Sequence, residues 1–269
     1  REKSKTTLRF RANNMNGNAD SKMGMGGINY IAQWGENDKI KLEGSYTFNA
    51  NNNKHWSWSD RDYFLTDEEI ADNPEEIYKR QLSNSNSQGK GSSHSFNARF
   101  EWKISERQRF MMRANVSTSD NESNGTSANN YFPVVGSDII LSNWNLGESD
   151  NINTGINGNY MLRIGEKAGR TMFINFNANY SDNGSGNENS SQKLIRSDSI
   201  SDIRQLSNSN SNNYSFGGSV TYAEPLSEQS QITMEYNANY NKSDADRLTN
   251  LWDNALGVYN DFISPEYSN

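Results

Sequence analysis

The chain has 269 residues, a net charge of −7 and a mean hydropathy of −0.97, and 32% of its residues are hydrophobic. These values approach those of disordered chains, but 11% of the residues are aromatic, which disordered chains usually lack. The absence of cysteine excludes disulfides, thiolate nucleophiles and zinc–cysteine sites. The acidic balance, without a Lys/Arg cluster, argues against nucleic-acid binding. No stretch approaches the roughly 18 consecutive apolar residues of a transmembrane helix.

Period-two alternation of apolar and polar residues runs through most of the chain and predicts β-strands. A first strand, around residues 8–13, is followed by four expected antiparallel hairpins near residues 23–50, 93–118, 151–181 and 213–242. Their tight turns fall at the sequences GEND, SERQ, GEKAG and AEPLSEQS. The pattern therefore predicts about nine strands of about 10 to 12 residues each.

In every predicted strand the apolar face falls on even-numbered residues, and no even position in a strand interior is charged. The tight turns alternate with polar stretches of about 30 to 40 residues, at 51–92, 120–150 and 181–212, which are expected to be long loops at one end of the sheet. The octapeptide RQLSNSNS, present at 80–87 and again at 204–211, is expected at the end of two such loops. Thr66 and Glu69 form a plausible capping box, which predicts a short helix in the first of them.

Three features favour a membrane-spanning β-barrel over a soluble sandwich or an extended adhesin. The predicted strands have the length that a tilted strand needs to cross an apolar band of about 25 Å. Long loops at one end and short turns at the other are typical of outer-membrane barrels. Aromatic residues lie near both ends of the strands, as interfacial girdles require: Trp34, Trp102, Tyr222, Phe48, Tyr180 and Tyr240. The predicted fold class is all-β, an antiparallel up-and-down transmembrane β-barrel.

An odd number of strands cannot close a bacterial single-chain barrel, in which strand numbers are even. The final stretch, LGVYNDFISPEYSN, is predicted to be loop and supplies no closing strand. We therefore expect this chain, residues 1–269, to be one segment of a larger barrel domain, located in the bacterial outer membrane and in contact with its lipid.

The hairpin style of the sequence resembles a known family. The stretch YAEPLSEQSQITMEYNANYNKSD, residues 222–244, combines an aromatic residue, a Pro-Leu-Ser turn and an alternating Tyr/Asn strand. It resembles the Bacteroidetes outer-membrane β-barrel family related to TonB-dependent receptors, and FEWKISERQRFMMRANVSTSDNES is a looser version of the same hairpin.

The resemblance implies a barrel of about 22 strands with an N-terminal plug, which imports nutrients too large for porins. It also implies the TonB energy-coupling system and a surface lipoprotein as partners, both through parts not found in this chain, which has no recognisable plug domain or energy-coupling box. The alternative is a non-transporting structural or adhesin-type barrel whose long loops bind a partner protein or surface ligand.

The aromatic stretch HWSWSDRDYF is the best ligand-binding candidate. Trp56 and Trp58 could stack on sugar rings or apolar peptide groups, with Asp60 and Arg61 supplying polar contacts. The simpler interpretation is that these residues anchor a loop at the outer interface.

On the polar, lumen-facing side of the strands, four arginines could contact a plug or an anionic substrate, or could belong to a hydrated wall with paired charges: Arg99, Arg109, Arg113 and Arg163.

Catalytic and metal sites are poorly supported. His55 and His94 are the two histidines, and neither has a legible catalytic partner, so no enzyme activity and no cofactor are expected. Oxygen ligands at Asp182, Asn183 and Glu188 could hold calcium, but the full spacing of a twelve-residue calcium loop is missing. These residues are more simply a polar loop.

Overall fold

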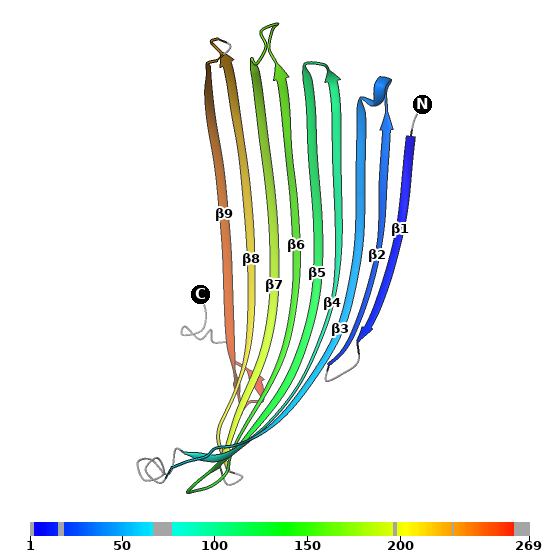
Figure 1. The fold of residues 1–269 in the computed structure, drawn as a ribbon. Coiled ribbons are helices and arrows are strands. Elements are labelled where there is room, and N and C mark those ends of the chain that lie inside the picture. The colour runs from blue at the N-terminus through cyan, green and yellow to red at the C-terminus, as the bar shows by residue number, and fades with distance from the viewer. Residues whose placement is uncertain (1–2, 16–18, 67–76, 196–197, 228, 261–269) are drawn as a thin grey trace.

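The computed structural model describes residues 3–15, 19–66, 77–195, 198–227 and 229–260, which form one antiparallel sheet whose ten strands follow one another in chain order (Figure 1). The strands are β1 (Lys3–Met15), β2 (Ala19–Trp34), β3 (Ile40–Asp62), β4 (Tyr78–Ser105), β5 (Gln108–Pro133), β6 (Ile139–Arg163), β7 (Thr171–Ile195), β8 (Asp198–Pro225), β9 (Gln231–Asp253) and β10 (Val258–Tyr259). A 3₁₀ turn, Glu36–Asp38, joins β2 to β3. In the part of the chain that the structure describes, no helix is long and apolar enough to cross a membrane.

Apart from irregular pairs at strand ends, such as Tyr78 with Pro133 and Leu194 with Ser199, the register of the ladder places even-numbered residues opposite even-numbered residues from β1 to β9. One line of partners, for example, runs through Tyr30, Gly44, Ala98, Ala114, Ile156, Ala178, Phe216 and Tyr240. Because side chains alternate along a strand, all even residues share one face of the sheet, the even face, and odd residues share the other, the odd face. The alternation found in the sequence thus becomes one continuous surface.

The even face carries an apolar belt next to the tight turns, and none of the described residues covers it. Large apolar side chains stand exposed across it, from Phe10 at 82% exposure in β1 to Tyr236 at 72% in β9. Among the described residues, only Ala32 and Ala223 are buried apolar residues. A single sheet of this kind has no hydrophobic core of its own, so its apolar face needs an apolar surrounding.

The predicted strand length was wrong, because the long polar stretches are strands and not loops. Strands β4 and β8 have 28 residues each, and β5, β6 and β7 have 25 or 26. They continue from the apolar belt into polar segments, the extensions, which bend to one side at the lower end of Figure 1. The described connections on this side are short, and Val134–Asp138 is the one between β5 and β6.

Cross-strand hydrogen bonds between small polar side chains explain why such polar sequences form strands. Ser83 Oγ donates to Asn129 Oδ1 over 2.6 Å, and Asn143 Nδ2 donates to Ser127 Oγ over 3.4 Å. The residues of each pair lie directly opposite each other in the ladder. Pairs of this kind stabilise a sheet. Asparagine and serine, which are typical of loops in a sequence without a known register, here serve as ladder partners.

Three local predictions change with the strand boundaries. Both copies of the octapeptide lie inside strands, Arg80–Ser87 in β4 and Arg204–Ser211 in β8. The expected helix after Thr66 falls mainly on residues 67–76, outside the described residues, and Tyr78–Gln81 belongs to β4. Val258 and Tyr259, expected in a loop, form β10 and pair with β9.

The rule that even positions are uncharged holds for the apolar belt but fails in the extensions. The first charged even residues beyond the belt are Lys54 in β3, Lys90 in β4, Asp120 in β5, Asp150 in β6, Asp182 in β7 and Lys242 in β9. In β8 asparagines occupy these positions, and the first charge beyond the belt is Arg204, whereas Glu224 lies at the tight-turn end of the strand. The belt therefore has a defined border on the side of the extensions, with polar groups on both faces beyond it.

This border is oblique to the ladder. The line of partners that starts at Lys54 in β3 ends at Asn250 in β9, whereas the first even charge of β9 is Lys242, eight residues closer to the tight turns. Over the six strand-to-strand steps from β3 to β9, the border thus moves toward the tight turns.

The predicted all-β, antiparallel, up-and-down arrangement is confirmed, and in the structure the sheet is open. Among the described strands, β1 pairs with β2 alone, and β9 pairs with β8 and β10.

Candidate functional site

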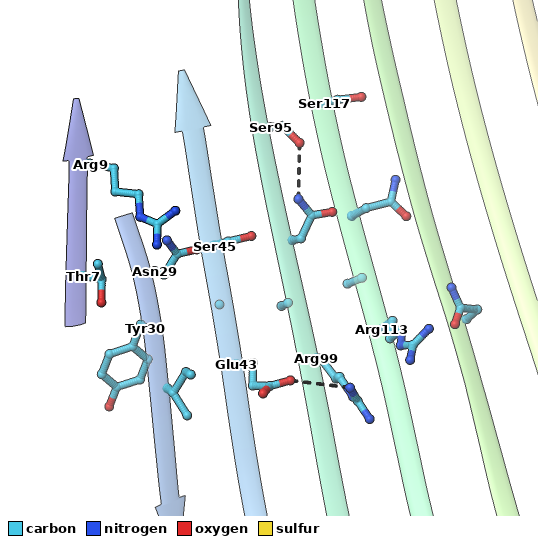
Figure 2. Close-up of a pocket in the computed structure, with 17 residues that line it drawn as sticks. Thr7, Arg9, Asn29, Tyr30, Glu43, Ser45, Ser95, Arg99, Arg113 and Ser117 are labelled. Atoms are coloured by element: carbon cyan, nitrogen blue, oxygen red, sulfur yellow. Dashed lines mark hydrogen bonds and ion pairs between the residues drawn. The ribbon is translucent and has the colours of Figure 1, made fainter. Parts of the chain in front are cut away.

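The odd face is hollowed at the level of the apolar belt, over strands β1 to β6. This hollow has a volume of about 640 Å³ (Figure 2). Its lining side chains come mainly from odd positions, and they include three arginines, one glutamate and a set of amides and hydroxyls. The polar residues are Thr7, Arg9, Asn29, Glu43, Ser45, Ser95, Asn97, Arg99, Arg113, Asn115, Ser117 and Asn157.

A chain of ion pairs forms the turn side of this hollow. Lys41 Nζ lies 2.6 Å from Glu43 Oε1, and Glu43 Oε2 lies 3.7 Å from Arg99 Nη1. Arg99 also pairs with Glu101, which in turn binds Arg109 Nη2 at 3.1 Å. The carboxylates of Glu43 and Glu101 therefore already have cationic partners, and two of the predicted lumen-facing arginines, Arg99 and Arg109, belong to this network.

The other cations around the hollow have no such partner. Neither Arg9 nor Arg113 makes an ion pair with a described residue, and both line the hollow. Arg113 lies directly opposite Arg99 in the ladder, so two guanidinium groups are neighbours on one face. The Nε of Arg99 is buried and has no hydrogen-bond partner among the described atoms. This part of the hollow thus has cationic donors without acceptors.

Arg163, the fourth predicted lumen-facing arginine, lies elsewhere on the odd face. It is the last residue of β6, next to the tight turn, and its backbone N–H donates to the carbonyl of Arg107 over 2.8 Å. It does not line the hollow. The structure therefore brings Arg99 and Arg113 together, places Arg109 in the adjoining ion-pair chain, and leaves Arg163 apart.

Trp56, Trp58, Asp60 and Arg61 lie in the extension of β3 and not in a loop. The alternation places the two tryptophans and Asp60 on the even face and Arg61 on the odd face. Asp60 already binds Arg80, with its Oδ1 2.8 Å from Arg80 Nε, and this hydrogen bond holds the pKa of Asp60 below its usual value. The four residues therefore do not form one site.

Trp56 lines a hollow of about 780 Å³ on the even face of the extensions, together with Trp144 and several amides and hydroxyls. Trp58, 66% exposed, is not part of this hollow. Two indole rings beside Asn and Ser side chains can stack on a sugar ring and bond to its hydroxyls. Of the four predicted ligand-binding residues, Trp56 is the one that lines this hollow.

The three weak calcium candidates are also separated. Asp182 and Glu188 point to the even face of β7 and Asn183 to the odd face, where it bonds to Ser211. Within the described ranges, no group of three or more His, Asp or Glu residues is placed to hold a metal ion. Glu188 accepts hydrogen bonds from Tyr259 and Arg204, which lower the pKa of its carboxyl group.

Arg204 is the centre of a cluster that sequence reasoning missed. Its guanidinium carbon lies 4.5 Å from the ring centre of Trp252, 5.5 Å from that of Tyr259 and 5.8 Å from that of Trp144. Burial and the bond to Glu188 raise the pKa of Tyr259 to about 12. These cation–π contacts join Trp144 of β6, Trp252 of β9 and Tyr259 of β10 to Arg204 of β8. No local sequence signal could have found them, because the partners come from four strands.

Both copies of the octapeptide start with an arginine that has the same role. Arg80 pairs with Asp60 of the preceding strand β3, and Arg204 pairs with Glu188 of the preceding strand β7. Each arginine thus ties the extension of its own strand to the neighbour on the even face.

At the tight-turn end, Glu224 of β8 binds residues of the turn between β6 and β7. It accepts hydrogen bonds from Arg170 at 2.7 and 2.8 Å, from Tyr222 at 2.6 Å and from Lys167 at 3.2 Å. The bonds from Arg170 and Tyr222 lower the pKa of Glu224 to about 2. This group fixes the turn after β6 to the end of β8.

The comparisons with known proteins add no family to these findings. No known protein family matches this chain, and no curated protein is similar to it.

Proposed function

We propose that this chain is part of the wall of a transmembrane β-barrel in the bacterial outer membrane. The observation that carries the proposal is the apolar belt of the even face, uncharged and exposed, with an oblique border. A soluble protein rarely leaves an apolar surface of such extent without a partner. A Lys or Arg in the middle of a bilayer costs about 2 to 4 kcal/mol, so lipid is the surrounding that selects against charge there.

The slope of the border supports the same proposal quantitatively. The border drops eight residues between β3 and β9, or about 1.3 residues per strand. With about 3.4 Å per residue and about 4.8 Å between strands, this drop corresponds to an angle of about 40°. Barrel strands tilt by about 35 to 45° to the membrane normal. A flat bilayer crossing tilted strands would produce a belt with this slope.

In this arrangement the tight turns lie in the periplasm, and the extensions project from the cell surface. The odd face lines the lumen, and its hollow with Arg9, Arg99 and Arg113 lies at membrane depth. A polar, hydrated wall suits the passage of polar solutes. Together with the hairpin resemblance to TonB-dependent receptors, it supports a role in importing a nutrient too large for porins, with a plug and an energy-coupling box elsewhere in the protein.

One observation favours a second candidate, a surface barrel that binds a partner without transport. The hollow beside Trp56 and Trp144 lies on the outside of the extensions, where a transported solute would not pass. A surface glycan is the ligand that its indole and amide groups suit best.

Cell fractionation tests the proposal. We expect the native protein in the detergent-resistant outer-membrane fraction, within a parent chain of about 80 kDa or more, since a barrel of about 22 strands needs more chain than is present here. Recovery of the protein in the soluble fraction would exclude the barrel. A membrane-embedded parent without a plug would favour the surface-binding candidate over the importer.

A further inference from the structure

The odd face is strongly cationic at the level of the apolar belt, although the whole chain carries a net charge of −7. In the belt segments of β1 to β9 whose side chains are described, the odd face carries eight basic residues and three acidic ones. The basic residues are Lys5, Arg9, Lys41, Arg99, Lys103, Arg109, Arg113 and Arg163, and the acidic residues are Glu43, Glu101 and Glu235. The distribution is one-sided, because the acidic residues that set the net charge lie largely in the extensions and turns.

We propose that the hollow lined by Arg9, Arg99 and Arg113 is a binding site for an oxyanion, a carboxylate or phosphate group carried by a small hydroxylated solute. The inference rests on the proposed function in one respect, since the solute would reach the hollow from the barrel lumen. It adds to that function the charge of the solute, which is negative, and its chemical class.

The position of Arg99 and Arg113 carries the argument. Like charges directly opposite each other in a ladder destabilise the sheet. Glu43 and Glu101 do not relieve this repulsion for Arg113, because their ion pairs are with Lys41, Arg99 and Arg109. An oxyanion between the two guanidinium groups would relieve it, and guanidinium binds carboxylate and phosphate in bidentate form.

The rest of the lining indicates what carries the oxyanion. Figure 2 shows Arg9 on the β1 side of the hollow, with Ser45, Ser95 and Ser117 on the successive strands β3, β4 and β5. Asparagine amides from β2, β4, β5 and β6 complete the lining. These groups both donate and accept hydrogen bonds, as sugar hydroxyls require. A volume of about 640 Å³ holds a solute of roughly disaccharide size.

The test is equilibrium binding to the full-length protein purified from outer membranes in a non-ionic detergent. Calorimetric titrations would use D-glucuronate, inorganic phosphate and glucose at low and at physiological salt. We expect one or both anions to bind, glucose to bind at least about tenfold more weakly, and added salt to weaken the anions alone. Glucuronate binding points to an acidic sugar as the source of the oxyanion, and phosphate binding to a phosphorylated solute.

Matched variants separate this site from a general attraction. Arg113→Gln should weaken anion binding by about tenfold or more, because it removes a charged hydrogen-bond donor that has no structural ion pair. Arg113→Lys keeps the charge but loses the planar guanidinium group, so its anion affinity should lie between those of the wild type and Arg113→Gln. Arg163→Gln removes the same charge from the same face outside the hollow and should leave binding within about twofold. Arg9→Gln is the second variant if Arg113→Gln fails to assemble.

Absence of binding by both anions, or equal weakening by Arg113→Gln and Arg163→Gln, would overturn the inference. Fractionation of the expressing cells, before purification, distinguishes this failure from failure of the proposed function. If the protein resides in the outer membrane and binds neither anion, the oxyanion site is wrong and the proposed barrel stands. If the protein is soluble and binds an anion at Arg113, the barrel is wrong and the oxyanion site stands.

Discussion

Phe100→Arg should nearly abolish assembly of the protein into the outer membrane. Phe100 lies in the middle of the apolar belt on β4, with Leu42 and Met112 as its ladder partners and the ring of Phe110 at 6.3 Å. A guanidinium group there would face the lipid interior, at a cost of about 2 to 4 kcal/mol. The loss of aromatic packing adds to this cost. The measurement is the yield of folded protein in outer membranes, with its midpoint of unfolding in urea.

Two other substitutions by arginine in the same strand serve as controls. Asn86→Arg introduces the same side chain on the even face, but in the extension, where the surrounding is water. Asn97→Arg introduces it at belt depth on the odd face. Both proteins should assemble at close to wild-type yield. If all three variants assemble equally well, the even face of the belt does not contact lipid.

When a protease that cleaves after glutamate is added to intact cells, it should cut the protein at the connection between β3 and β4 and leave the tight turns uncut. This connection, residues 63–77, has four glutamates in its sequence, at positions 68, 69, 75 and 76. The turns at the other end have glutamates in their sequences at positions 36, 106, 166 and 228, which the proposed topology places in the periplasm. Glu122, Glu148 and Glu188 lie in paired strands, and ladder hydrogen bonds protect them.

Permeabilised cells provide the matched control. Once the protease enters the periplasm, fragments that end at position 36, 106, 166 or 228 should appear. Cleavage at these turns in intact cells, with the 63–77 connection spared, would invert the proposed topology. Cleavage in intact cells throughout the extensions would instead show that these segments are loops in the native protein.

Strand identity and facing could be predicted from the sequence, because both depend on local alternation. Phe96, Phe100 and Trp102 alternate with charged residues, and the ladder places them on the even face as expected. Strand length could not be predicted in the same way. Asn and Ser have low intrinsic β-propensity, and their cross-strand bonds, such as Ser83 to Asn129, depend on a register that local sequence does not contain.

The candidate site was predicted in part for the same reason. Facing alone identified Arg99 and Arg113 as residues of one surface, but the register was needed to make them direct neighbours and to separate Arg163. The contacts of Arg204 with Trp144 and Trp252 depend on strands far apart in sequence. The aromatic stretch at 55–64 was misassigned to a loop, and its alternation across the two faces, which divides Asp60 from Arg61, was therefore overlooked.

We expect the even face to contact lipid up to the oblique border and water beyond it. The chain has no cysteine, so a single introduced cysteine carries a unique spin label. Labels at successive positions from Ile232 to Trp252 on β9 would be compared for collision with oxygen, which concentrates in lipid, and with a water-soluble nickel complex.

We expect oxygen accessibility to alternate with a period of two from 232 to 240, high at even positions, and nickel accessibility to dominate at even positions from Lys242 onward. The same scan on β3 should place the change near Lys54, which the ladder aligns with Asn250 and not with Lys242. High nickel accessibility at the even positions of the belt, or a change that follows a single line of ladder partners, would contradict a membrane crossing by tilted strands.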